Sequence, residues 1–296
     1  MERELFKTSQ YIRTVNLEGI LTGGDTSIAL TDENSSKPSF ALEIPVFQSE
    51  SLSPVLSELY GEEHDFKKLF NFAQKTQADI ICLTFNLPEK DIDSEIKKSV
   101  AAAEKYVKKS AKPIMIKGSE NKQIDVVLLS ELAKAIKRQV IIAYAEETTY
   151  EQIIPAVIKN NHLVVLRTPI DINLAKELNI LTTDMGLDAD KIIMDTNIGA
   201  LGYGLDYGFS IIEKIRLAAF EGDLMLNMPI ISFIGAETYK TKETKTDAFP
   251  PSWGNYSERA LMWEISAVSS VISAGADLIV CSHPKTIDTV REVLWN

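Results

Sequence analysis

The chain has 296 residues, of which 45% are hydrophobic and 25% are charged, with a formal net charge of -11 at pH 7. This composition predicts a soluble globular protein with enough apolar residues for one large α/β domain or two small ones. The 42 acidic residues outnumber the 31 lysines and arginines, which disfavours nucleic acid and anionic membrane surfaces as partners.

Three further sequence features indicate the cellular compartment of the protein. The apolar runs are far shorter than the roughly 20 residues of a membrane helix. Residues 1–10 are charged and lack the apolar centre of a secretory signal. Cys82 and Cys281 each lie within an apolar run, which predicts buried free thiols rather than a disulfide or metal ligands. We therefore expect a cytoplasmic protein.

Residues 1–39 are mostly hydrophilic and rich in turn-forming residues, around positions 23–25 and 34–36. A short apolar segment lies on each side of the glycines at 23 and 24, which predicts a β-hairpin. We expect this N-terminal extension to pack on the domain formed by residues 40–296.

Eight strand-length apolar segments follow, with helical segments between them. They are residues 40–47, 78–85, 113–117, 140–144, 163–167, 191–195, 228–234 and 277–283. Each is apolar throughout rather than at alternate positions, as in parallel strands that are covered on both faces. Eight such units in about 250 residues predict an α/β fold, a closed (β/α)8 TIM barrel, with the N-terminal hairpin as a plug at its bottom.

Two of the intervening helices carry recognisable end signals. Residues 91–110 begin with acidic residues and end with lysines, which complements the helix dipole and predicts a solvent-exposed outer helix. Ser257, followed by Glu258, is the expected N-cap of a helix that stops at Gly275.

The most distinctive segment is residues 199–208, where four glycines follow the strand at 191–195. Glycine allows the backbone to approach a ligand closely and to adopt positive φ. The apolar spacing after residue 208 predicts that the loop opens a helix. The glycines do not match GxGxxG or GxxxxGK[ST], so neither dinucleotide binding nor a P-loop is predicted. A ligand-binding loop and a tightly packed connection both stay open.

Polar residues and two glycines mark the predicted carboxyl ends of the strands, where TIM barrels carry their functional groups. They are Asn86, Lys117, Gly118, Tyr144, Arg167, Thr168, Asp195, Thr196, Asn197, Gly235 and His283. The sequence has no HxH motif and only three histidines, so a metal-hydrolase site is not expected.

Individual members of this ring allow two interpretations each. Asp195 either accepts hydrogen bonds from a ligand amide or pins its own loop. Lys117 either forms a Schiff base or pairs with a carboxylate such as Glu43, and pairing is favoured. Arg167 either donates to a ligand or forms an ion pair, and the ion pair is the default. His283 either donates to a ligand or caps the next helix or loop.

Residues 236–256 separate the seventh strand from its helix by far more than the usual 2 to 6 residues. Lysines are mixed here with Tyr239, Phe249 and Trp253 in an otherwise acidic chain. Long loops of this kind predict a lid or a docking surface that is mobile in the free chain, and the alternative is packing over the barrel mouth.

The chain resembles the small (delta) subunit of the corrinoid iron-sulfur protein of the carbon monoxide dehydrogenase/acetyl-CoA synthase system. Three segments carry the resemblance: MDTNIGALGYGLDYGFSIIEKIRLAAFEGDLMLNMPII, WGNYSERALMWE and AGADLIVCSHP. The similarity extends from about residue 40 to the C-terminus and is densest after residue 191, and HLVVLRTPIDINLAKELN adds to it.

The resemblance implies a TIM barrel paired with a large subunit that carries an iron-sulfur cluster and a corrinoid domain. The cobamide would lie between that domain and the mouth of this barrel, and this chain would hold no cluster and no metal of its own. The pair would carry a methyl group from a methyl-pterin methyltransferase to acetyl-CoA synthase, with the chemistry supplied by cobalt, so no catalytic residue is assigned to this chain.

Candidate cobamide contacts are drawn from the glycine loop, the later strand ends and the long loop. They are Asp195, Thr196, Asn197, Gly199, Ala200, Gly202, Tyr203, Gly204, Gly235, Trp253 and His283. Two other functions remain open: a TIM-barrel methyltransferase that recognises a pterin through Asp195 and Asn197, and an aldolase that uses Lys117.

Overall fold

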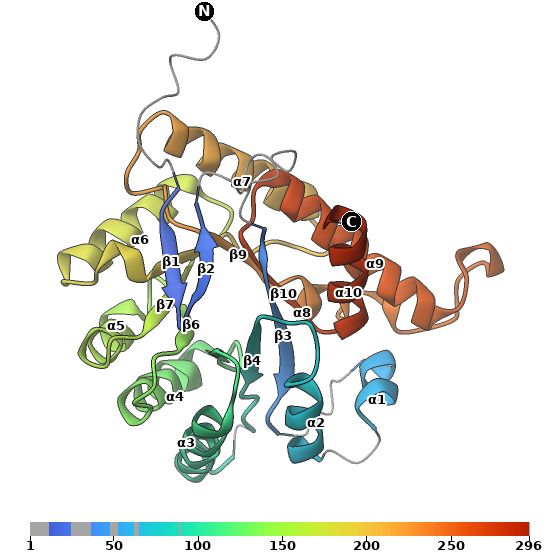
Figure 1. Cartoon of the computed structure of the whole chain (residues 1–296), viewed down its shortest axis with the longest axis horizontal. Helices are drawn as coiled ribbons and strands as arrows, with labels where there is room; N and C mark the ends of the chain where they lie inside the picture. Colours follow the sequence, from blue (N-terminus) through green and yellow to red (C-terminus); the bar gives the residue numbers. More distant parts are fainter. Residues whose placement is uncertain (1–11, 25–36, 48–52, 62–64, 89, 296) are drawn as a thin grey trace, which may run out of the picture.

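The computed structural model describes residues 12–24, 37–47, 53–61, 65–88 and 90–295 of the chain. Its centre is a closed parallel barrel with the strand order β10-β3-β4-β5-β6-β7-β8-β9 (Figure 1). The strands are β3 (Ser39–Pro45), β4 (Ile80–Thr84), β5 (Ile114–Lys117), β6 (Ile141–Ala145), β7 (Leu163–Arg167), β8 (Ile192–Asp195), β9 (Ile230–Ser232) and β10 (Leu278–Cys281). Each strand overlaps one of the predicted apolar segments, so the TIM-barrel prediction is confirmed.

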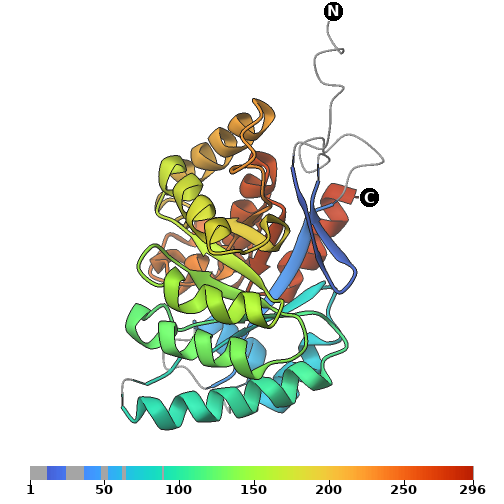
Figure 2. The same cartoon turned by 90° about the vertical axis from the view of Figure 1, so that its left-hand side faces the viewer.

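Helices form the outer layer around this barrel (Figures 1 and 2). They are α1 (Pro54–Tyr60), α2 (Phe66–Ala73), α3 (Ile92–Lys109), α4 (Lys122–Ala135), α5 (Tyr150–Lys159), α6 (Ile172–Asp184), α7 (Leu205–Phe220), α8 (Ile234–Thr238), α9 (Tyr256–Ala274) and α10 (Pro284–Trp295). The described residues also contain the short 3-10 turns η2 (Ala189–Lys191), η3 (Lys242–Thr244) and η4 (Pro251–Trp253).

The N-terminal hairpin is present, but its turn differs from the prediction. Strands β1 (Thr14–Leu17) and β2 (Ile20–Gly23) pair antiparallel, and Glu18 and Gly19 form the turn, both with positive φ. The turn of this hairpin therefore lies at residues 18–19 and not at the predicted residues 23–25, where Gly23 is the last residue of β2. The other turn-rich positions, 34–36, lie outside the described residues.

The hairpin closes the end of the barrel where the strands begin, and Figure 2 shows it beside the ring of helices. Val15 and Leu17 are almost completely buried and join the cluster of side chains inside the barrel. The barrel residues of that cluster are Ala41, Ile80, Cys82, Met115, Ile141, Ala143, Leu163, Val165, Ile193, Ile231, Phe233, Leu278 and Val280. Burial of these apolar side chains supplies the main driving force for closure, and it confirms the predicted plug.

Two helix starts differ from the sequence-based expectation. The N-cap of α9 is Asn255, whose side chain accepts a hydrogen bond from Glu258 N, so the assignment of Ser257 is wrong. Helix α7 begins at Leu205 rather than after residue 208, so the glycine loop is shorter than expected. At the other end of α9 the prediction is confirmed, since Gly275 is the C-cap with φ 109°.

Candidate functional site

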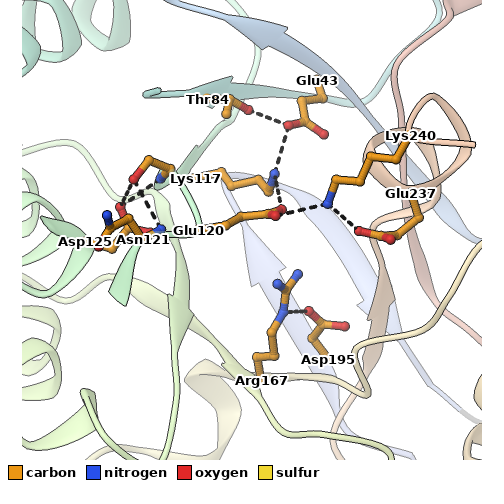
Figure 3. Close-up of polar contacts among 11 residues, drawn as sticks. Glu43, Thr84, Lys117, Glu120, Asn121, Asp125, Arg167, Asp195, Glu237 and Lys240 are labelled. Carbon is orange, nitrogen blue, oxygen red and sulfur yellow. Dashed lines mark hydrogen bonds and ion pairs between the residues drawn. The ribbon is translucent and has the colours of Figure 1, made fainter. Parts of the chain in front are cut away.

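Lys117 lies at the centre of an ion-pair network in the barrel mouth (Figure 3). Its side chain is 4% exposed, and Nζ lies 3.1 Å from Glu43 Oε1 and 3.2 Å from Glu120 Oε1. Burial alone would lower the pKa of Lys117, but the two carboxylates raise it above its ordinary value. The predicted pairing with Glu43 is therefore confirmed, and a raised pKa disfavours the neutral amine that a Schiff-base lysine needs.

The same network crosses the mouth to the segment after α8. Lys240 Nζ lies 3.0 Å from Glu120 Oε2 and 2.7 Å from Glu237 Oε1. Against the cost of burial, Lys117 and Lys240 lower the pKa of Glu120 to about 2. Glu120 is thus ionised at any physiological pH and connects the loop after β5 to α8.

A second ion pair closes the opposite side of the mouth. Arg167 Nε donates to Asp195 Oδ2 at 2.5 Å, and Asp195 Oδ1 accepts a hydrogen bond from Asn197 N at 2.9 Å. The guanidinium carbon of Arg167 lies 3.3 Å from the centre of the Tyr144 ring. The ion pair expected for Arg167 is confirmed, and Asp195 pins its own loop.

A cavity of about 300 Å³ opens beside Lys117, between the ends of β3, β4 and β5, helix α1 and the α8 segment. Glu43, Ser53, Tyr60 and Gly235 contribute to its lining. Two polar atoms of these residues, Glu43 Oε2 and Ser53 Oγ, are buried without a hydrogen-bond partner among the described residues. Buried polar atoms are normally paired, so two orphans at one cavity mark it as a place for a ligand.

A smaller cavity of about 230 Å³ lies beside α6, at the ends of β6, β7 and β8. Arg167 and Thr168 line it together with Asn197, while Leu174 and Leu178 of α6 provide an apolar wall. Its position behind the Arg167–Asp195 pair separates it from the cavity at Lys117.

Glu264 on α9 fixes the turn between β10 and α10, close to the larger cavity. Its Oε1 accepts from Ser282 N at 2.7 Å, and its Oε2 accepts from Thr286 Oγ1 at 2.6 Å and from the Tyr239 hydroxyl at 3.3 Å. Complete burial raises the pKa of Glu264 to about 7, although these hydrogen bonds act in the opposite direction. Tyr60 reaches the same turn, since its hydroxyl donates to Ser282 O at 2.5 Å.

The structure distributes the predicted site residues over the whole mouth. Gly235 lines the larger cavity, and Asn197 lines the smaller one. Asp195, Thr196 and Ala200 are buried. Sequence analysis named Glu43 as a partner of Lys117 but did not place it among the candidate ligand contacts, although a charged residue within an apolar strand is a usable signal.

The remaining predicted contacts lie on the glycine loop and beyond it. Gly202 has φ +80°, and nothing lies within 4 Å of a Cβ built there, so it faces open space. At Gly199 a Cβ would lie 2.1 Å from Tyr203 O, which makes this glycine a packing requirement. Gly204 is the N-cap of α7 with φ 101°, and Tyr203 is half exposed. The ring nitrogen Nδ1 of His283 accepts from Lys285 N and caps the start of α10.

Residues 236–256 contain the end of α8 and the short turns η3 and η4, rather than the plain loop that we expected. Arg259 of α9 is buried and donates to the backbone carbonyls of Glu243, Thr246 and Gly254. Trp253 remains 47% exposed and stacks between Phe249 and Trp263. Residues of the first half of the segment, Ala236, Tyr239, Lys240 and Lys245, line the cavity at the mouth. The docking role and the mobility in the free chain stay predictions.

Two other features, a cluster of metal ligands and a membrane-spanning helix, are absent from the described ranges. In those ranges, no group of three or more His, Cys, Asp or Glu side chains is arranged to hold a metal ion. Across the same part of the chain, no helix has the length and apolarity needed to span a bilayer. Cys82 and Cys281 are buried free thiols, as predicted.

Comparisons with known proteins give a consistent result. A family model described as the CO dehydrogenase/acetyl-CoA synthase delta subunit matches residues 18–280. The acetyl-CoA decarbonylase/synthase complex subunit delta 1 of Methanosarcina thermophila is 30% identical over 285 residues, which cover 93% of this chain and 65% of that protein. The delta subunit of Methanopyrus kandleri is 29% identical over 204 residues, covering 68% of this chain and 50% of the relative. This chain thus spans half to two thirds of these relatives.

Solved structures with a similar fold include dihydropteroate synthases. The enzyme of Xanthomonas albilineans with 4-aminobenzoic acid has a TM-score of 0.61 at 13% identity, covering 95% of this chain and 97% of that one. The Yersinia pestis enzyme with a pterine-sulfa conjugate has a TM-score of 0.58 at 14% identity, covering 95% and 96% of the two chains. At this identity the likeness concerns the fold.

Proposed function

Because the chain belongs to the CO dehydrogenase/acetyl-CoA synthase delta subunit family, we propose that it is the barrel subunit of a corrinoid iron-sulfur protein. Its partner is a large subunit that carries the iron-sulfur cluster and a corrinoid domain. The pair carries a methyl group from a methyl-pterin methyltransferase to acetyl-CoA synthase. The corrinoid supplies the methyl-carrying cobalt when bound.

One observation of the mouth supports this role. Its charged side chains neutralise one another, in the sets Lys117–Glu43–Glu120 and Arg167–Asp195. Such pairs build a rigid polar surface and leave no free acid, base or nucleophile among them. A surface of this kind suits a subunit that binds and shields a cofactor without performing chemistry itself.

The residues of the mouth fit a corrinoid, which is a large ring bordered by amide side chains. Gly202 offers backbone that a flat ring can approach closely, since no atom lies within 4 Å of a Cβ built there. Glu43 Oε2 and Ser53 Oγ are unpartnered and can bond to amide groups. The surrounding wall would be formed by the other residues of the glycine loop together with Gly235, Trp253 and His283. This wall would hold the ring in place and exclude water.

Coexpression with the large subunit tests the assignment. We expect a one-to-one heterodimer with a visible corrinoid spectrum, and an obligate interface of roughly 2,000 Å² or more. Sedimentation that shows only separate monomers at micromolar concentration would contradict the proposal.

The alternative is a pterin-binding methyltransferase, for which the fold is suitable. Asp195, the carboxylate expected to bind the pterin, is already engaged by Arg167 and by Asn197 N. Calorimetry of the isolated chain with methyltetrahydrofolate distinguishes the two functions, because only the alternative predicts heat of binding.

A further inference from the structure

The Glu43 carboxylate uses only one of its two oxygens within the protein. Oε1 accepts hydrogen bonds from Thr84 Oγ1 at 2.6 Å and from Lys117 Nζ at 3.1 Å (Figure 3). Oε2 is buried and has no partner among the described residues. A carboxylate oxygen is an acceptor, so Oε2 needs a donor from outside the described part of the chain.

Ser53 supplies a second unused group at the same cavity. It occupies the N-cap position of α1, yet its hydroxyl makes no capping hydrogen bond. The residue is 3% exposed, and Oγ has no partner in the described part of the chain. A hydroxyl can donate as well as accept, so it complements the acceptor-only oxygen of Glu43.

The charges around the free oxygen of Glu43 favour a neutral group at that position. Lys117 and Lys240 are already paired with Glu43, Glu120 and Glu237. An anion would meet the free oxygen of Glu43, and a cation would compete with two lysines. A planar primary carboxamide fits both orphan atoms, because its NH₂ donates and its carbonyl oxygen accepts.

The size of the cavity limits what can enter. About 300 Å³ is the lower end of the range for small-molecule sites. It is too small for a whole corrin ring but large enough for one of the short amide arms that extend from the ring edge.

We propose that the cavity beside Lys117 receives one primary carboxamide arm of the corrin ring, with its NH₂ donating to Glu43 Oε2 and its carbonyl accepting from Ser53 Oγ. This assignment rests on the proposed corrinoid role. It makes Glu43 and Ser53 the residues that set the rotational position of the ring on the barrel.

Cobalamins in which one carboxamide has been hydrolysed to a carboxylate provide the probe. The heterodimer is prepared without corrinoid, and binding of cobalamin and of each monocarboxylate isomer is followed by visible absorbance. We expect one isomer to bind the native heterodimer at least about tenfold more weakly than cobalamin, since it loses a donor to a charged acceptor and adds a like charge.

Glu43→Gln should reverse the preference of the cavity between a carboxamide arm and a carboxylate arm. Its side-chain oxygen can still accept from Thr84 and Lys117, while its NH₂ replaces Oε2 and donates to the carboxylate of the weak isomer. Binding of that isomer should recover, and binding of cobalamin should fall about tenfold to a hundredfold. Ser53→Ala should weaken cobalamin about twofold to tenfold.

Ser232→Ala is the matched control. Ser232 is also fully buried with an unpartnered Oγ, but it does not line the cavity. This variant should bind every probe like the native heterodimer, and thermal melting confirms that all three variants fold.

The outcomes separate the proposal from the function on which it rests. If all isomers bind the native heterodimer as tightly as cobalamin, the carboxamide site is wrong while the corrinoid function stands. If the native heterodimer binds no corrinoid, the proposed function fails as well. If a methyl-tetrahydropterin binds the isolated chain and Ser53→Ala abolishes that binding, the cavity is a pterin site and the proposal is refuted.

Discussion

Replacing Glu264 by glutamine should remove a pH dependence of stability that the buried carboxyl creates. Glu264 is fully buried on α9 and has a pKa of about 7, against 4.5 for an ordinary glutamate. Between these two values the folded chain binds a proton that the unfolded chain has released. The free energy of unfolding therefore falls as the pH rises through this range.

The size of the effect follows from the pKa difference. A shift from 4.5 to 7 corresponds to about 3.4 kcal/mol in total, of which about 2.5 kcal/mol falls between pH 5 and pH 8. Tyr60 and Tyr239 also face Glu264, but burial raises the pKa of both well above this range. Burial also raises the pKa of the Cys281 thiol well above its ordinary value. Burial lowers the pKa of His162 and of His283 from 6.5, but both histidines are present in the native chain and in the variant, so the difference between the two proteins isolates Glu264.

Urea unfolding of the native chain and of Glu264→Gln at a series of pH values measures this effect. Other carboxyl groups titrate in both proteins, so they cancel in the difference between the two free energies. The native chain should lose about 2.5 kcal/mol relative to the variant from pH 5 to pH 8. A change below about 1 kcal/mol would refute the reasoning, whatever the absolute stability of the variant.

Further predictions concern packing, charge and affinity. Gly235→Ala should lower the melting temperature strongly, because its Cβ would lie 2.3 Å from Ser282 N. Gly202→Ala should lower the free energy of unfolding by only the roughly 1–2 kcal/mol that a left-handed backbone costs a residue with a side chain. Equal melting temperatures of the two variants would contradict this. Lys117→Met leaves Glu43 unpaired and should cost about 3–5 kcal/mol in urea unfolding. Borohydride with a carbonyl compound should leave Lys117 unmodified in the native chain, and a reduced adduct detected by mass spectrometry would show otherwise. The chain without its partner should bind free cobamide weakly, since one face of the ring stays in water, and a submicromolar dissociation constant would overturn this.

The barrel was predictable because every strand is buried on both faces and therefore reads as a continuous apolar segment. Helix starts were less predictable. Ser257 and Asn255 are both good capping residues, and only the backbone path decides that Asn255 caps α9. Residues 236–256 have the composition of a loop, and the carbonyl contacts of Arg259 that order them have no sequence signature.

The site was predictable only in part, for a related reason. Lys117 and Glu43 stand out as charged residues in apolar strands, and their pairing follows from burial. Ser53 lies on α1, outside the strand ends on which the analysis relied. Its unused hydroxyl results from a missing cap bond, which depends on atomic positions.

The two cysteines lie in the strands on either side of β3. Cys82 is in register with Glu43 on one side, and Cys281 is in register with Leu42 on the other. Both thiols are fully buried, and burial raises the pKa of each. Alkylating reagents attack thiolates, so we expect Cys281 to react when β10 separates from β3 and Cys82 to react when β4 separates from β3. The rate at which the two thiols are labelled in the native chain therefore reports how often the barrel opens. A bound corrinoid or partner subunit that stabilises the mouth should lower this rate.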